Sequence, residues 1–188
     1  MMVRILAAGA AVALWALSAA SAGADVIDAV KIGRWNGGAL ASNGTVTQCV
    51  LASRFKGAAA DARNYVVFYS VSRASGFAIA IQDPQLQLEP GRAMTVKLTL
   101  DGDEPTSFDG KAVGPNVVAF YPGDAQRLKA GLAKATAVVP EVDAVPYAYP
   151  TEGAGEIVAW LDACAARHGF ADSGFEKGRA EEERKLDQ

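Results

Sequence analysis

Hydrophobic and polar residues alternate in several short stretches of the chain, with the two-residue period of a β-strand that buries one face. In the clearest stretch, 93–100, every second residue is apolar: Met94, Val96, Leu98 and Leu100. The stretch 65–71 is apolar at almost every position, as expected for a central strand that is covered on both sides. The pattern therefore predicts a β-rich protein.

Turn-forming residues separate these stretches. The pair Asn43-Gly44 lies between two predicted strands, 26–41 and 46–55, and is the strongest short-range signal of a β-hairpin. The pair Asp109-Gly110 predicts another turn, after a strand near 106–108. Many short strands joined by such turns are typical of antiparallel sheets.

A helical period replaces the strand period in two places. Apolar residues recur at the spacing i, i+3, i+4 and i+7 in one of them: Ile157, Trp160, Leu161 and Cys164. This spacing predicts a C-terminal helix near 154–168, and Gly169 supplies its stop. A shorter helix is predicted near 124–134, with Asp124 as its N-cap.

Together these elements predict a mainly β fold, either an antiparallel β-sandwich or an open barrel that carries the two helices. We expect one β-rich domain over residues 25–170, because no repeat or linker divides the chain. Residues 171–188 contain six acidic and four basic residues and almost no apolar ones. Such a composition predicts a charged tail that is disordered or at most a frayed helix.

Residues 1–24 have the pattern of a signal peptide. Arg4 precedes an apolar run that ends near Leu17, and Ala22-Gly23-Ala24 offers a small-x-small cleavage site. The triplet Ala20-Ser21-Ala22 is a competing site. The sequence therefore predicts a periplasmic or secreted protein, and no later segment is long and apolar enough to span a membrane.

The predicted mature chain is acidic. Removal of residues 1–24 takes away Arg4 and no acidic residue, which leaves 17 basic and 21 acidic residues and a formal net charge of −4. Nucleic-acid-binding domains usually carry a basic patch or a basic net charge. The charge therefore argues against a nucleic-acid partner.

The two cysteines, Cys49 and Cys164, both lie in the predicted mature region. Export would place them in an oxidising compartment, which favours one intramolecular disulfide. Two free thiols and an intermolecular bridge are the alternatives. A bridge closing a loop of about 115 residues would stabilise the fold by up to about 4–5 kcal/mol on the chain-entropy account.

The sequence offers no evident catalytic set. His168 is the only histidine, and its place in the last turn of the predicted helix suits an end-cap that offsets the helix dipole. There is no Gly-x-Ser-x-Gly elbow, no metal-ligand cluster and no phosphate-binding glycine loop. We therefore predict no catalytic residue, no metal site and no cofactor.

Carboxylates leave one enzymatic alternative open, a small hydrolase that uses a carboxylate pair in glycosidic chemistry. Five acidic residues are candidates for such a pair: Asp61, Glu89, Asp109, Glu141 and Asp143. A solvated surface is the simpler interpretation of these residues.

Tyr147 and Tyr149 are the candidate binding residues. They alternate within a short predicted strand, 145–149, so both rings lie on one face, and Pro146 and Pro150 flank them. Tyrosines on a rigid segment suit a recognition surface. The competing interpretation is that both rings pack in the core beneath the last helix.

Several short motifs resemble the invasion-associated locus B family of exported alphaproteobacterial proteins. They are a first strand led by Trp35, a hairpin with Cys49, the run Leu88-Glu89-Pro90-Gly91, the strand 96–102, a short helix with Leu128 and Leu132, and the closing helix. The chain departs from the family in the cysteines that some members add and in the residues 150–153 before the last helix. The resemblance implies an exported β-rich protein linked to the envelope or to host interaction.

The leading hypothesis is therefore an exported, non-catalytic β-domain that binds a protein or a cell-envelope component. A periplasmic inhibitor of a lytic enzyme is a second binding hypothesis, and the small carboxylate-dependent hydrolase is the rival from another class. The inhibitor would present a protruding loop, whereas the hydrolase would place two carboxyl groups across a cleft.

Overall fold

A computed structural model describes residues 25–57 and 63–170. The predicted signal peptide, 1–24, and the predicted disordered tail, 171–188, therefore lie outside the described residues. The described part is mainly β and antiparallel, as predicted, and two helices accompany the strands.

The strands cover most of the described chain. Their bounds are β1 Asp25–Ile32, β2 Trp35–Ser42, β3 Thr45–Lys56, β4 Asn64–Ser72, β5 Gly76–Gln82, β6 Ala93–Leu100, β7 Thr106–Gly114, β8 Val117–Phe120, β9 Ala137–Val142, β10 Val145–Pro146 and β11 Tyr149–Pro150. The helices are α1 Ala125–Leu132 and α2 Ala154–Arg167, close to the predicted 124–134 and 154–168.

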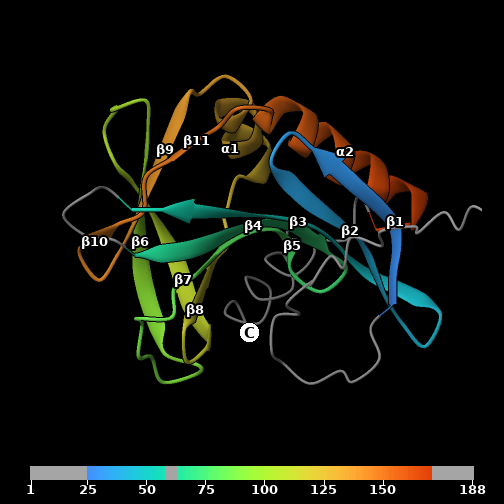
Figure 1. The fold of residues 1–188 in the computed structure, drawn as a ribbon, viewed down its shortest axis with the longest axis horizontal. Helices are drawn as coiled ribbons and strands as arrows, with labels where there is room; N and C mark the ends of the chain where they lie inside the picture. Colours follow the sequence, from blue (N-terminus) through green and yellow to red (C-terminus); the bar gives the residue numbers. More distant parts are fainter. Residues whose placement is uncertain (1–24, 58–62, 171–188) are drawn as a thin grey trace, which may run out of the picture.

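All described strands belong to one open antiparallel sheet. Its order is β1-β2-β3-β4-β5-β8-β7-β6-β9-β10, and β11 also pairs with β9. Figure 1 shows that β3 and β4 extend across the view, whereas β6 and β7 run down it, so the sheet curls between its two halves. The sheet has two ends, β1 and the β9–β10 hairpin, and is not a closed barrel.

The main hydrophobic core lies on the inner face of the curled sheet. Inner-facing residues of all the longer strands contribute to it, and both helices add apolar side chains: Leu128, Leu132, Ile157, Leu161 and Cys164. The apolar spacing that predicts the C-terminal helix is thus the face that the helix buries. α2 packs against β3 and β4 and covers the inner side of the sheet.

The two cysteines form the predicted disulfide. Cys49 of β3 and Cys164 of α2 are 115 residues apart in sequence and 6.2 Å apart at their Cα atoms. Both are fully buried. The bridge joins the helix to the middle of the sheet.

The predicted first strand, 26–41, is two strands. Gly33 adopts a φ of +55° and, with Arg34, turns the chain back so that β1 pairs antiparallel with β2. The glycines that follow Trp35 lie within β2, where a Cβ on Gly37 would stand 1.9 Å from the carbonyl oxygen of Val50. Close approach to β3, rather than a turn, requires glycine there.

The predicted turn at Asp109-Gly110 is also wrong. Both residues lie inside β7, and Gly110 pairs with Met94 of β6 and with Phe120 of β8. A Cβ on Gly110 would stand 2.9 Å from Cγ2 of Val96. The glycine therefore makes room for a neighbouring side chain in the middle of a strand.

Candidate binding surface

Of the two interpretations of Tyr147 and Tyr149, the structure contradicts the exposed recognition surface and shows packing in the core. Their side chains are 1 % and 2 % exposed and belong to the main core. Tyr149 lies on β11, and Tyr147 lies between β10 and β11. Both are at an end of the sheet, where strands that contain proline are usually found. Alternation places both rings on one face, and that face is the inner one.

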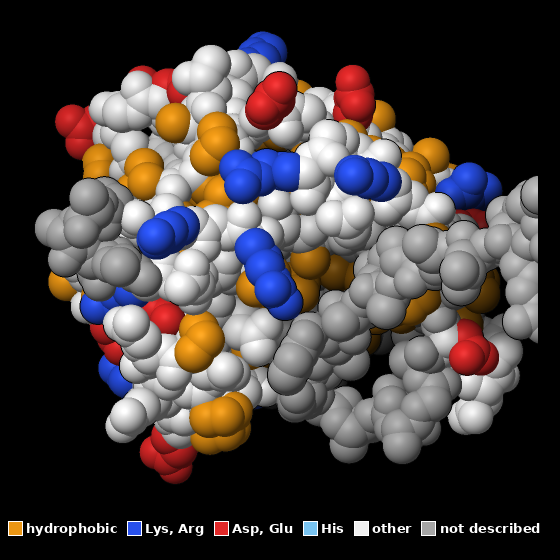
Figure 2. All heavy atoms as spheres, in the orientation of Figure 1, with side chains coloured by type: hydrophobic (Ala, Val, Ile, Leu, Met, Phe, Trp, Pro, Cys, Tyr) orange, Lys and Arg blue, Asp and Glu red, His pale blue; other side chains and the backbone are white. Residues whose placement is uncertain are grey.

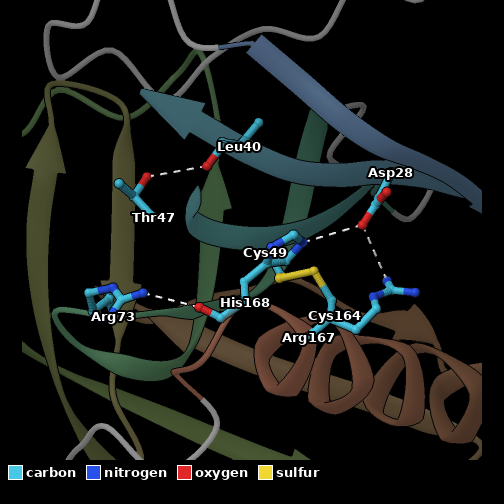
Figure 3. Close-up of a disulfide and its surroundings, with 8 residues drawn as sticks. All are labelled: Asp28, Leu40, Thr47, Cys49, Arg73, Cys164, Arg167 and His168. Atoms are coloured by element: carbon cyan, nitrogen blue, oxygen red, sulfur yellow. Dashed lines mark hydrogen bonds and ion pairs between the residues drawn. A yellow bond between two sulfur atoms is a disulfide. The ribbon is translucent and has the colours of Figure 1, made fainter. Parts of the chain in front are cut away.

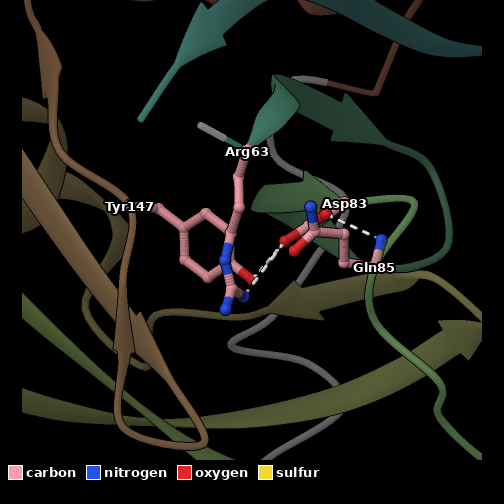
Figure 4. A network of polar contacts seen from close by, with 4 residues as sticks. All are labelled: Arg63, Asp83, Gln85 and Tyr147. Carbon is pink, nitrogen blue, oxygen red and sulfur yellow. Dashed lines mark hydrogen bonds and ion pairs between the residues drawn. The ribbon is translucent and has the colours of Figure 1, made fainter. Parts of the chain in front are cut away.

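Each of these tyrosine hydroxyls has a buried partner. Tyr147 donates a hydrogen bond of 3.0 Å to Oδ2 of Asp83, a residue directly after β5 (Figure 4). The same carboxylate is 3.4 Å from Nη1 of Arg63 and accepts a 2.8 Å bond from the backbone N–H of Gln85. Asp83 is fully buried, and these three contacts compensate its charge. The network thus links the segment directly after β5 to Tyr147 and to Arg63.

Burial also determines how the core tyrosines ionise. Desolvation, followed by the hydrogen bond to Asp83, raises the pKa of Tyr147 well above its usual value. Desolvation raises the pKa of Tyr65 to about 12, although the nearby charge of Arg34 opposes the shift. The pKa values of Tyr69 and Tyr149, whose hydroxyl oxygens are 3.0 Å apart, are raised by desolvation as well.

His168 lies at the end of α2, where the sequence predicts an end-cap. Its backbone N–H donates to the carbonyl oxygen of Cys164, and its ring Nε2 lies 3.3 Å from Oδ2 of Asp28 (Figure 3). Arg167 approaches the same carboxylate at 3.6 Å. Asp28 has a φ of +51° at the irregular register of β1, so these contacts fasten the first strand to the helix.

Two of the candidate hydrolase carboxylates line one open hollow of about 370 Å³ on β6, β9 and the turn after β9. Glu141 lies 3.4 Å from Nζ of Lys97, and Asp143 lies 3.3 Å from Nη1 of Arg92. Each carboxylate is thus paired with its own cation. Such pairing favours an ordinary charged surface over a carboxylate pair poised for catalysis.

The other candidate carboxylates are not brought into this hollow. Glu89 and Asp109 are exposed and do not line it, and Asp61 lies outside the described residues. Within residues 25–57 and 63–170, no group of three His, Cys, Asp or Glu side chains has a geometry that could hold a metal ion. Over the same ranges, neither helix is long and apolar enough to cross a membrane.

A second hydrophobic cluster lies on the opposite side of the sheet from the core. Neighbouring residues of a strand point to opposite faces, so Val50 points away from the core that Cys49 and Leu51 enter. The cluster consists of Val50, Phe68, Ala80, Val117 and Ala119, with Leu40, Ala52, Val66, Val113 and Tyr121 packed around it. We call these ten residues the outer face.

Strand register brings the outer face together. One cross-strand row runs from Ala52 through Phe68, Ala80 and Ala119 to Lys111. Two small residues, Ala52 and Ala80, stand on either side of the Phe68 ring in this row. An apolar sheet face of this kind suits close packing against another protein element.

Basic residues flank the outer face. The outward positions of β3 include Arg54 and Lys56 beside it, and β7 places Lys111 and Asp109 on the other side. All four are exposed. Three of these four charges are positive in a chain whose formal net charge is −3. Figure 2 shows that Lys and Arg side chains also gather across the middle of one face of the whole molecule.

These features define a class of protein: a disulfide-bonded, mainly β domain with a curled antiparallel sheet and a second hydrophobic cluster on the side of the sheet away from the main core. No protein-family model matches the chain. No curated protein and no solved structure is detectably similar to it. The resemblance to the invasion-associated locus B family therefore stays a prediction that rests on the short motifs quoted above.

The outer face is the candidate site that sequence reasoning did not find. Its one signal is the stretch 65–71, whose apolar residues on both sides predict a strand covered on both faces. The structure shows what that pattern means: Tyr65, Val67 and Tyr69 enter the core, and Phe68 points to the outer face.

Proposed function

We propose that this protein is an exported, non-catalytic β-domain that binds a protein or a component of the cell envelope through its outer face. The observation that carries the proposal is the second apolar cluster, centred on Phe68 and separate from the core. Contiguous apolar surface with a polar rim is characteristic of interaction sites. An aromatic side chain at the centre of such a surface is the usual anchor of a binding interface.

Three features support export. Residues 1–24 have the order of a signal peptide: a basic residue, an apolar run and a small-x-small site. The disulfide between Cys49 and Cys164 fits an oxidising compartment. The resemblance to the invasion-associated locus B family agrees with the same location and with a binding role.

The experiment compares capture of partners by matched variants of the purified chain. Phe68→Asp places a charge at the centre of the outer face, and Val66→Lys places one at its margin. Thr95→Asp is the control, because Thr95 is an exposed outward residue of β6, in the charged half of the sheet. Each variant is immobilised, incubated with an extract of the producing cell's envelope, and its bound components are identified by mass spectrometry.

We expect a component that the unchanged chain and Thr95→Asp both retain and that Phe68→Asp and Val66→Lys both lose. Thermal unfolding of each variant establishes that it is folded, and Val66→Lys keeps the test valid if Phe68→Asp is not. Equal retention by all variants would contradict binding through the outer face. Turnover of a glycan substrate that is lost in Glu141→Gln would instead favour the hydrolase.

A further inference from the structure

Two of the four asparagines of the chain, Asn36 and Asn43, are followed directly by glycine. In such a pair the backbone nitrogen of the glycine can attack the side-chain carbonyl carbon of the asparagine, because the glycine has no Cβ to hinder the approach. The side-chain nitrogen leaves as ammonia, and a cyclic succinimide forms. Water then opens the ring to aspartate or isoaspartate. Overall, an asparagine and a water molecule give an aspartyl residue and ammonia.

Asn43 and Gly44 form the turn between β2 and β3, and their surroundings allow this reaction. Both residues are exposed, with φ angles of +51° and +74°. Neither the side chain of Asn43 nor the backbone N–H of Gly44 makes a hydrogen bond to another described residue. A Cβ on Gly44 would meet no atom within 4 Å. The attacking nitrogen and the amide that it attacks are therefore both unrestrained.

Asn36 and Gly37 are the same pair of residues in a different setting, inside β2. Gly37 is buried and pairs with Val30 of β1 on one side and with Leu51 of β3 on the other. Nδ2 of Asn36 donates a hydrogen bond of 3.2 Å to the carbonyl oxygen of Arg34. A succinimide can form here only after β2 separates locally from its neighbours, and that opening costs free energy.

We propose that Asn43 is a site of spontaneous deamidation in the folded protein and that the sheet protects Asn36 from the same reaction. This inference is independent of the proposed function, because it concerns a turn and not the outer face. The chemical co-reactant is water alone.

The two products at position 43 differ in their effect on the hairpin. Aspartate tolerates a positive φ much as asparagine does, so the turn keeps its shape and gains a negative charge. Isoaspartate carries the chain through its side-chain carbon and so lengthens the backbone. A two-residue turn of that kind no longer joins Ser42 to Thr45 in their present register.

The test follows both asparagines over time in the same sample. The purified chain, with its disulfide intact, is incubated in mildly alkaline buffer and then digested at acid pH. Mass spectrometry with fragmentation measures the aspartyl and isoaspartyl products at positions 36 and 43. A second sample is kept unfolded in guanidinium chloride under reducing conditions. Asn36→Gln and Asn43→Gln each remove one reacting site and are the matched controls.

We expect Asn43 to convert at least about tenfold faster than Asn36 in the folded chain, the ratio that about 1.4 kcal/mol of local opening produces. In the unfolded chain the two should convert at similar rates, because each is then an Asn-Gly pair in an open chain. Asn36→Gln should leave the rate at position 43 unchanged. Chains that carry isoaspartate at position 43 should unfold at a lower temperature than the Asn43→Asp variant.

Equal rates at the two positions of the folded chain would overturn the proposal, since β2 would then give Asn36 no protection. A folded chain in which Asn43 stays unchanged while the unfolded chain converts would overturn it as well. The same ratio of rates in the folded and the unfolded chain would assign the difference to neighbouring residues in the sequence and not to the fold, against the proposal. Equal unfolding temperatures of the isoaspartyl chain and Asn43→Asp would contradict the effect on the turn.

Discussion

Tyr147 and Tyr149 show what single residues reveal about their surroundings before a structure is known. Alternation correctly predicts that the two rings share a face, but it does not say on which side of the sheet the core lies. Their partners, Asp83 and Tyr69, are 64 and 80 residues away in sequence. Only the fold brings these partners to the hydroxyl groups, so the burial of the tyrosines could not be derived locally.

The buried tyrosines make the fold sensitive to alkaline pH. Their pKa values are raised in the folded state. The contribution of their neutral form to the free energy of unfolding is therefore complete below the pKa of the unfolded chain, about 10, and is lost as the pH rises toward the pKa values of the folded state. Desolvation raises the pKa of Tyr65 to about 12 and those of Tyr69, Tyr147 and Tyr149 as well. We expect no tyrosinate absorbance from these four residues near pH 10.5.

An ultraviolet titration with circular dichroism at each pH provides the measurement. We expect tyrosinate absorbance to rise together with loss of the fold, near or above pH 12. Four tyrosines that titrate near pH 10 in a folded chain would contradict the burial of these side chains.

At the scale of the elements, the helices could be predicted and some strand boundaries could not. The signals for α1 and α2 are local: Asp124 accepts the N-cap bond from Arg127, and the apolar spacing is the buried face of α2. No local signal in the sequence predicts the role of Gly110. Its role depends on the Val96 side chain of the neighbouring strand, which the sequence does not place beside it.

The disulfide joins β3 and α2, and its two cysteines are 115 residues apart in the sequence. Replacing Cys49 and Cys164 together by Ala should lower the free energy of unfolding by about 4 kcal/mol, because the unfolded chain regains the entropy of the open loop. Urea unfolding with fluorescence detection measures this change, with the reduced unchanged chain as the matched control.

The reduced chain should unfold at the same urea concentration as the double variant. A double variant as stable as the oxidised chain would contradict this role of the bridge. So would the finding that both cysteines of the purified, unreduced chain react with an alkylating reagent.

For the whole molecule, the informative feature is that the sheet carries apolar side chains on both sides. Inward, they form one core with the helices, and outward they form the face around Phe68. The fold class follows from strand and turn patterns along the chain. The outer face does not, because it exists only when register aligns Ala52, Phe68, Ala80 and Ala119 across four strands.

The proposed binding role is tested most directly by photo-crosslinking in the cells that produce the protein. A photoreactive phenylalanine analogue replaces Ala52 on the outer face in one chain and Thr95 in the control, where the residue is exposed on β6. Irradiation followed by mass spectrometry shows which molecules lie beside each position. We predict a defined crosslink to a protein or envelope component from position 52 and none to that component from position 95. The same crosslinks from both positions, or none from position 52, would contradict the account.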